Sequence, residues 1–263
     1  MQLPKLNPRL ARLIDFMPNY FERLVDVGAD HCYLPLHLLA QGKTNQILAI
    51  ECKEGPLEQG KRHARRFGFI DAFEFKLANG LRETDVLPTD WVVIAGMGGL
   101  EIRDILNEAN LPAGVQLVLQ PMKSTPELRK FLFENGFVIC NEQLAWSKGY
   151  FYPLIHVAVD TAYTNSRRNN TSPTTFAREL TSEDREQDFE INFKKNRVSD
   201  LELDIYIGPI LRHHEYHDAV TRQLWPAYRS KELRRAARIA ASSGEELWSR
   251  IADFYREENE HED

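Results

Sequence analysis

The chain has 263 residues, 43% of them hydrophobic and 27% charged, which is ordinary for a globular protein with room for one large domain and a smaller one. No apolar run reaches the roughly 20 residues that a membrane helix needs, and no cationic-then-apolar leader opens the chain, so we expect no membrane partner. The net charge of -6 neither requires nor excludes nucleic acid, because binding depends on local basic patches.

The first 160 residues alternate between short apolar runs and amphipathic stretches. The pattern predicts a helix at 5–20 that ends at Pro18. After this helix, strands are expected at 21–28, 45–52, 73–79, 90–99 and 115–121. The helices between and after them are expected at 33–42, 55–69, 101–110 and 124–136. Two adjacent strands, 137–146 and 150–159, follow the last of these helices.

This order of elements predicts an α/β fold. Near-continuous apolar strands that alternate with helices indicate a parallel sheet covered on both faces, and the final strand pair indicates an antiparallel edge. The combination is the pattern of the Rossmann-like class I methyltransferases, although the first steps would also fit a dinucleotide dehydrogenase. We expect residues 1–160 to form the catalytic domain.

The composition changes at Thr161, where Ser, Thr and Asn become frequent. We expect a linker or exposed loop at 161–181 and a small all-α domain, a helical hairpin or bundle, at 182–263. Its helices are predicted at about 182–197, from Gly208-Pro209 through Trp225, at 228–242 and at 245–258.

The cysteines and histidines lack the spacing of a metal site. Cys32, Cys52 and Cys140 are odd in number and include no CxxC pair, which favours reduced thiols in the cytoplasm over disulfides or zinc. His213 and His217 would share a helical face, but no cysteine or carboxylate stands at ligand spacing. We therefore expect surface histidines and no metal.

The turn after the first strand is the most informative element of the sequence. Ligands of open α/β sheets bind beyond the carboxyl ends of the strands. Here Gly28 is the single glycine where a dinucleotide fingerprint has three, so a ligand without phosphates, such as S-adenosylmethionine, is favoured over NAD. Asp30 alone could equally cap the next helix, but together with His31 and Tyr33 it favours a functional site.

Other strand ends offer groups to the same cleft. Glu51 can accept hydrogen bonds from ribose hydroxyls, or it is a solvated surface residue; Asn79-Gly80 can contact an adenine edge, or it is a simple turn. The glycine-rich run after the fourth strand would leave backbone open to a ligand. The expected cofactor-binding residues are Asp26, Gly28, Glu51, Asn79, Gly80, Gly96, Met97 and Gly98.

In order, the strand ends and the helices behind them contain the pieces DVGADH, ECKEGP, LANGL, VIAGMGGLEIRDIL, LVLQP and ELRKFLFENGF. From about Asn7 to Val159 this set resembles the TrmK family of bacterial tRNA (adenine) N1-methyltransferases, and DVGADHCYLP with IAGMGG is its specific pair. The chain departs from the family at Asn79, where Asp is usual, and at Met122, where Asn is common.

The resemblance implies methyl transfer from S-adenosylmethionine to N1 of an adenosine in the D-arm region of tRNA. Asp30 is then the candidate catalytic carboxylate and His31 its orienting partner. The expected substrate-binding residues are Tyr33, Gln120, Pro121, Arg234, Arg235 and Arg238. No obligate protein partner is evident. Two alternatives stay open: methylation of another RNA or heterocycle, and a non-catalytic module that binds the cofactor or RNA.

Overall fold

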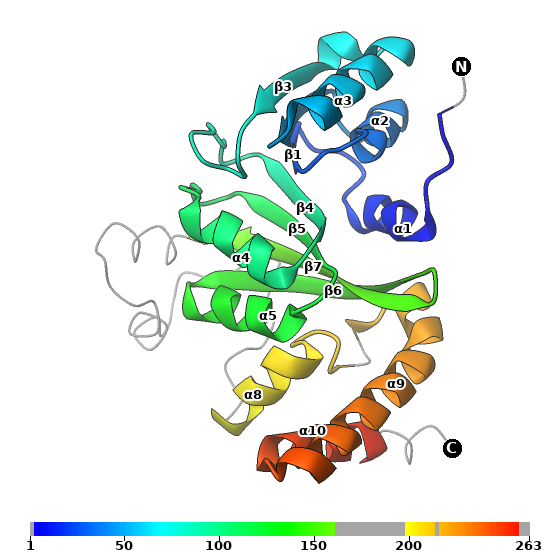
Figure 1. Ribbon diagram of the computed structural model, residues 1–263, viewed down its shortest axis with the longest axis vertical. Helices are drawn as coiled ribbons and strands as arrows, with labels where there is room; N and C mark the ends of the chain where they lie inside the picture. The colour runs from blue at the N-terminus through cyan, green and yellow to red at the C-terminus, as the bar shows by residue number, and fades with distance from the viewer. Residues whose placement is uncertain (1–2, 161–197, 214–215, 258–263) are drawn as a thin grey trace.

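The computed structural model describes residues 3–160, 198–213 and 216–257 (Figure 1). The linker predicted at 161–181 and the helix predicted at about 182–197 lie outside these ranges. Among the described residues, no helix is long and apolar enough to cross a membrane.

A seven-stranded sheet runs through the molecule in the order β3-β2-β1-β4-β5-β7-β6. The strands are β1 (Arg23–Val27), β2 (Gln46–Glu51), β3 (Phe73–Leu77), β4 (Trp91–Met97), β5 (Gln116–Pro121), β6 (Phe137–Ser147) and β7 (Tyr150–Val159). Pairing is parallel from β3 to β5, whereas β7 runs antiparallel to both of its neighbours. The predicted Rossmann-like methyltransferase sheet with antiparallel last strands is confirmed.

Helices cover both faces of the sheet (Figure 1). They are α1 (Pro8–Phe16), α2 (Tyr33–Ala40), α3 (Glu54–Arg66), the short η1 (Ile70–Ala72), α4 (Gly99–Glu108) and α5 (Thr125–Glu134). Leu13 of α1 and Leu38 of α2 are buried in one apolar cluster with strand residues such as Val93. Ile102 of α4 and Leu128 of α5 are buried in a second cluster on the opposite face.

Helix α1 is shorter than its apolar pattern predicts. It begins after Asn7, whose side-chain oxygen accepts a hydrogen bond from the Leu10 backbone N–H at 2.9 Å, and Pro8 occupies the first helical position. It ends at Phe16, two residues before Pro18. The cap fixes where α1 starts and therefore which of its side chains face the sheet.

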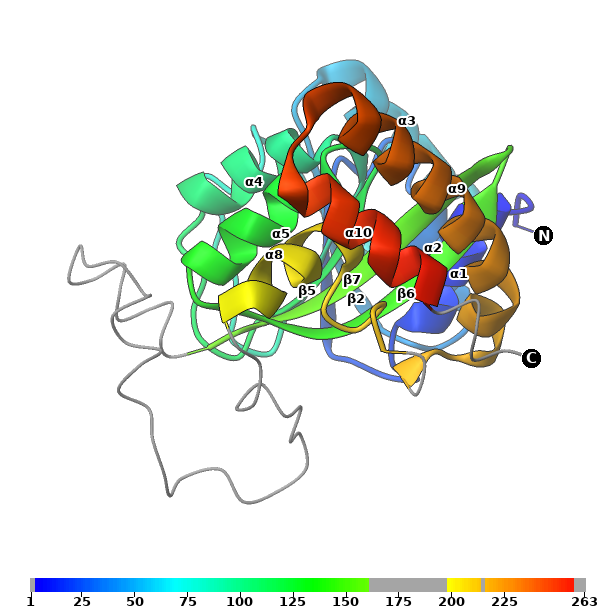
Figure 2. The same cartoon turned by 90° about the horizontal axis from the view of Figure 1, so that it is seen from below.

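The C-terminal helices are α8 (Val198–Ile207), α9 (Ala219–Ser243) and α10 (Glu246–Glu257). Figure 2 shows α9 and α10 side by side as a hairpin, and Trp225, Ile251 and Tyr255 share an apolar cluster with Leu144 of β6. The helix predicted from Gly208 through Trp225 is wrong in its first half, because residues 208–213 form turns and α9 begins only at Ala219. The surface position predicted for His217 is also wrong, since its side chain is buried against Trp225.

A buried ion pair holds these helices against the sheet domain. The guanidinium of Arg129, on α5, lies 2.8 Å from the carboxylate of Glu142, on β6, and both side chains are almost completely buried. Arg129 also donates to the Tyr206 carbonyl at 3.1 Å, and Glu142 accepts from the Ile210 backbone N–H at 3.1 Å. Glu142 thus ties the turn after α8 to β6.

We expect Glu142→Ala to lower the free energy of unfolding by about 3–5 kcal/mol, because it leaves the buried Arg129 charge unpaired. The control is Glu134→Ala, which removes the exposed Lys130–Glu134 pair, 3.8 Å apart, and should cost about 0.5 kcal/mol or less. Urea denaturation measures both. Equal losses in the two variants would show that the buried pair does not hold the helices in place.

Candidate active site

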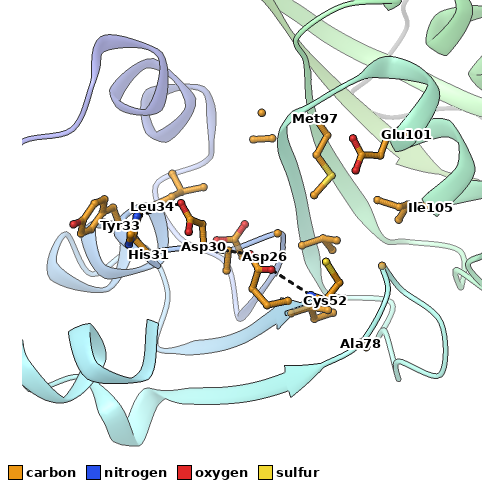
Figure 3. A pocket seen from close by; sticks show the side chains of 18 of the residues that line it. Asp26, Asp30, His31, Tyr33, Leu34, Cys52, Ala78, Met97, Glu101 and Ile105 are labelled. Carbon is orange, nitrogen blue, oxygen red and sulfur yellow. Dashed lines mark hydrogen bonds and ion pairs between the residues drawn. The ribbon is translucent and has the colours of Figure 1, made fainter. Parts of the chain in front are cut away.

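A cavity of about 390 Å³ lies at the carboxyl ends of β1, β2 and β4, where the strand order reverses (Figure 3). Asp30, His31 and Tyr33 line it, as do all of the predicted cofactor-binding residues except Gly98. Gln120, Pro121 and the three arginines of α9 are not among the residues that line it. Strand ends that are far apart in the sequence thus contribute to a single site.

The turn after β1 has an unusual backbone. Gly28 has a φ of +74°, which favours glycine, and a Cβ at this position would lie 2.3 Å from the methyl carbon of Met97, so that side chain would have to move. Asp30 (φ 44°) and Cys32 (φ 58°) also adopt the left-handed region, which is costly for residues with side chains. Strain of this kind persists only where surrounding contacts hold it.

Glu51 makes the contacts that hold this turn. Its carboxylate, 9% exposed, accepts hydrogen bonds from the backbone N–H groups of Asp30 at 2.7 Å and Cys52 at 3.2 Å. Glu51 is therefore not the solvated surface residue of the alternative interpretation. An ionised carboxylate has about four acceptor positions, so it can still accept hydrogen bonds from a ligand in the cavity.

Asp26 lies beneath this loop with only 5% of its surface exposed. Burial, and next the negative charge of Glu51, raise the pKa of Asp26 from 3.8 to about 7. The cavity floor therefore holds a carboxyl group that changes its charge near neutral pH. A cationic ligand beside it would favour the ionised form.

Asp30 and His31 form a polar pair at the cavity, labelled in Figure 3. An oxygen of the Asp30 carboxylate lies 3.5 Å from His31 Nε2, and 61% of the Asp30 side chain is exposed. Capping by Asp30 is not observed: Cys32 precedes α2 as its cap residue, and no side chain bonds to the helix start. The carboxylate is free to meet a second ligand.

The His31 ring is part of an aromatic stack that includes a residue missed by sequence reasoning. Tyr33 stacks on His31 with ring centroids 5.3 Å apart and on His63 of α3 with centroids 5.2 Å apart. His63 Nδ1 also donates to the His31 carbonyl at 2.9 Å. The basic pattern of α3 marks it as a charged helix, and no sequence signal ties its His63 to the strand-one turn.

The glycines after β4 divide between two tasks. Gly96 lines the cavity with a φ of +83°. Gly99 instead packs on the loop after β5, because a Cβ there would lie 2.2 Å from the Ser124 carbonyl oxygen, and its N–H donates to the Lys123 carbonyl at 2.8 Å. Gly98 lies against Lys123 and outside the cavity lining. Part of the glycine excess therefore serves packing and not an open floor.

Arg9 is the second residue that sequence reasoning missed. It projects from α1, and it is the only lysine or arginine among the described residues that line the cavity. Its guanidinium donates to the side-chain oxygen of Gln120, which is fully buried, and desolvation by burial lowers the pKa of Arg9. Gln120 thus contacts Arg9 and does not itself line the cavity. Only the packing of α1 brings this cation to the strand ends.

The predicted RNA contacts lie elsewhere. Arg234, Arg235 and Arg238 are exposed on α9, whereas Arg229, in the same basic run, is buried. No group of three potential metal ligands occurs within the described ranges.

Residues 6–155, more than half of the chain, match a family model described as a methyltransferase domain. The chain belongs to this methyltransferase family. Among curated relatives, the tRNA (adenine(22)-N(1))-methyltransferase of Bacillus subtilis is 28% identical over 153 residues, which cover 57% of this chain and 64% of that protein. The sequence match therefore spans less than two thirds of that relative.

Solved structures of this methyltransferase family extend the likeness to nearly the whole chain. The B. subtilis M1A22 tRNA methyltransferase TrmK aligns with a TM-score of 0.61 and 21% identity, over 97% of this chain and 96% of that one. A putative tRNA (m1A22) methyltransferase of Streptococcus pneumoniae, solved with S-adenosyl-L-methionine, aligns with a TM-score of 0.65 and 22% identity. This alignment covers 96% of this chain and 99% of that one. The expected TrmK family is confirmed, and the shared fold includes the C-terminal helices.

The raised pKa of Asp26 predicts a pH-dependent stability. Between about pH 4 and 7 the folded methyltransferase keeps a proton that the unfolded chain has lost, so this group lowers the free energy of unfolding as pH rises. Asp26→Asn removes the titration and should flatten that decline, by at most about 4 kcal/mol. Denaturant unfolding at stepped pH measures it, with the exposed Asp104→Asn as control. Parallel profiles for wild type and Asp26→Asn would contradict the assignment.

Proposed function

We propose that this protein is an S-adenosylmethionine-dependent methyltransferase that modifies N1 of an adenosine in the D-arm region of tRNA. The observation that carries the proposal is the cavity itself, in which a single-glycine turn, a buried glutamate and a glycine backbone meet at the switch point of a methyltransferase sheet. The names of the B. subtilis and S. pneumoniae relatives support the acceptor.

The cavity residues fit the donor by their chemistry. Glu51 has free acceptor positions for the two ribose hydroxyls, and Asn79 with Gly80, which line the same cavity, would contact the adenine. Gly28 and Gly96 let backbone approach a ligand without phosphates. Arg9 supplies a cation for the carboxylate of the methionine part, and Asp26 a carboxyl group for its cationic part. When bound, S-adenosylmethionine supplies an electrophilic methyl group.

The acceptor side needs positioning more than proton transfer. Adenine N1 carries a lone pair in the ring plane, so no base has to remove a proton first, and orientation supplies most of the catalysis. The exposed Asp30 carboxylate can stabilise the positive charge that develops on the adenine, and His31 orients that carboxylate. Tyr33 offers a ring for the base, which must be unpaired or flipped to expose N1.

The proposal also assigns a role to each region of the chain. We propose that residues 1–160 hold the catalytic site and that the C-terminal helical region, predicted at 182–263, binds RNA after a linker at 161–181. The exposed Arg234, Arg235 and Arg238 would contact phosphates. The cytoplasm, where tRNA is modified, is the proposed location.

Mass spectrometry of tRNA nucleosides, mapped to position after incubation with and without the protein, tests this function. We expect N1-methyladenosine to appear at one D-arm position only when S-adenosylmethionine is present. A methylated product in a different RNA would support the alternative acceptor. Cofactor binding by calorimetry without any methylated product would support the non-catalytic module.

Replacement of Asp30 by alanine should lower the rate of methyl transfer about tenfold or more, equivalent to about 1.4 kcal/mol or more, because the developing adenine charge loses its carboxylate. Affinity for S-adenosylmethionine, measured by calorimetry, should stay unchanged. Asp104→Ala is the matched control, since this side chain is also 61% exposed but lies outside the cavity. Unchanged turnover in Asp30→Ala would remove Asp30 from the mechanism.

Replacing Arg234, Arg235 and Arg238 together with glutamine should weaken tRNA binding. The slope of log affinity against log salt concentration should become shallower by roughly 0.7 to 0.9 for each phosphate that the protein no longer neutralises. Filter binding across a range of salt concentrations measures both. The matched control replaces three exposed arginines of α3, namely Arg62, Arg65 and Arg66. If the α9 variant keeps the affinity and the salt slope of the wild type, α9 does not bind phosphates.

A further inference from the structure

The tip of the β6–β7 hairpin carries large aromatic side chains into solvent. Trp146 is 43% exposed and Tyr150 is 61% exposed. Ser147 pairs with Tyr150, so Lys148 and Gly149 form a two-residue turn, and both have positive φ, as such tight hairpin turns require. Trp146 pairs with Phe151 and Ser147 with Tyr150, so the two exposed rings point to opposite faces of the hairpin at its tip.

The hairpin tip lies at the same edge of the sheet as the cavity. β5 and β6 both pair antiparallel with β7, so β6 points in the direction of the parallel strands and ends at their carboxyl edge. Figure 1 shows the tip beside α1. The side chains connect the two places: Arg9, in the cavity lining, lies 5.9 Å from the Tyr152 ring, whose centroid lies 6.4 Å from that of Tyr150.

Positive charge accompanies the rings. Lys231 of α9 lies 6.0 Å from the Tyr150 centroid and 5.7 Å from that of Phe151, and Phe151 packs against Trp146 with centroids 4.4 Å apart. Lys148 is exposed in the turn itself. Within the part of the chain that is described, neither lysine has a carboxylate at ion-pair distance. Aromatic faces beside free ammonium groups are complementary to bases joined by phosphates.

We infer that Trp146 and Tyr150, with Lys231 beside them, form a hairpin platform: the two rings stack unpaired nucleotides of the acceptor RNA next to the methylated adenosine, one on each face of the hairpin tip, and Lys231 contacts a phosphate. The inference rests on the proposed function and adds a binding site to it. An adenosine with its N1 edge free has lost its pairing, so its neighbours must also be held by the protein. Stacking is sequence-tolerant and suits a platform outside the catalytic cavity.

The experiment compares the wild type with the double variant Trp146→Ala/Tyr150→Ala, with an unmodified tRNA transcript as probe. We expect RNA affinity to fall about tenfold or more, with a matching rise in the KM for tRNA, while the Kd for S-adenosylmethionine is unchanged. The variant Trp146→Phe/Tyr150→Phe keeps the rings and should retain most of the affinity. Lys231→Gln should weaken binding mainly at low salt.

Tyr20→Ala is the matched control, because this ring is 60% exposed but precedes β1 at the opposite edge of the sheet. If wild type methylates the transcript and the double alanine variant binds it equally well, the platform is refuted and the proposed function stands. A loss that the phenylalanine variant fails to restore also overturns stacking. If wild type neither binds nor methylates the transcript, the proposed function fails as well.

Discussion

The bond between the Glu51 carboxylate and the Asp30 backbone N–H is the interaction on which the candidate site depends. It joins the end of β2 to the turn after β1 and holds that turn in a left-handed backbone that a non-glycine residue adopts only under constraint. Because the turn is fixed, the Asp30 carboxylate and the His31 ring face the cavity mouth while Asp26 stays beneath. One buried carboxylate therefore shapes both the cavity and the approach to it.

The order of the strands places the turn after β1 between groups from two other strands, and so forms the site. β1 lies between β2 and β4, so the turn after β1 meets Glu51 on one side and Met97 on the other. The strand order reverses beside β1, which is the place where ligands of open α/β sheets bind. Away from the cavity, the Arg129–Glu142 pair joins α5 and β6 to α8 and the segment after it. These contacts fix the position of the C-terminal helices on the sheet domain.

Much of the site was predictable because parallel strands present their carboxyl ends together. This rule, applied to Asp26, Glu51 and Gly96, correctly predicts that they share one cavity. It does not apply to Arg9, which reaches the cavity from α1, or to His63 of α3, which stacks on Tyr33 outside the cavity lining. The position of a helix relative to the sheet depends on packing and not on strand register. Sequence reasoning also expected the whole glycine-rich run to be open to a ligand and assigned Gly98 to the cofactor site. It missed the contacts of Gly98 with Lys123 and of Gly99 with Ser124, because both are long-range.

The sequence by itself determined the seven strands and the α-helices between them, because each follows its own apolar run or amphipathic period. Tertiary structure decided what happens between Gly208 and Asp218. There the backbone N–H of Ile210 bonds to Glu142 of β6 and the His217 ring is buried against Trp225, contacts that local helical periodicity does not encode. Tertiary structure also decided that Lys231 lies near the rings of Tyr150 and Phe151, the second of which packs on Trp146. Their proximity follows from how α9 crosses the hairpin, and a one-dimensional pattern does not contain that crossing.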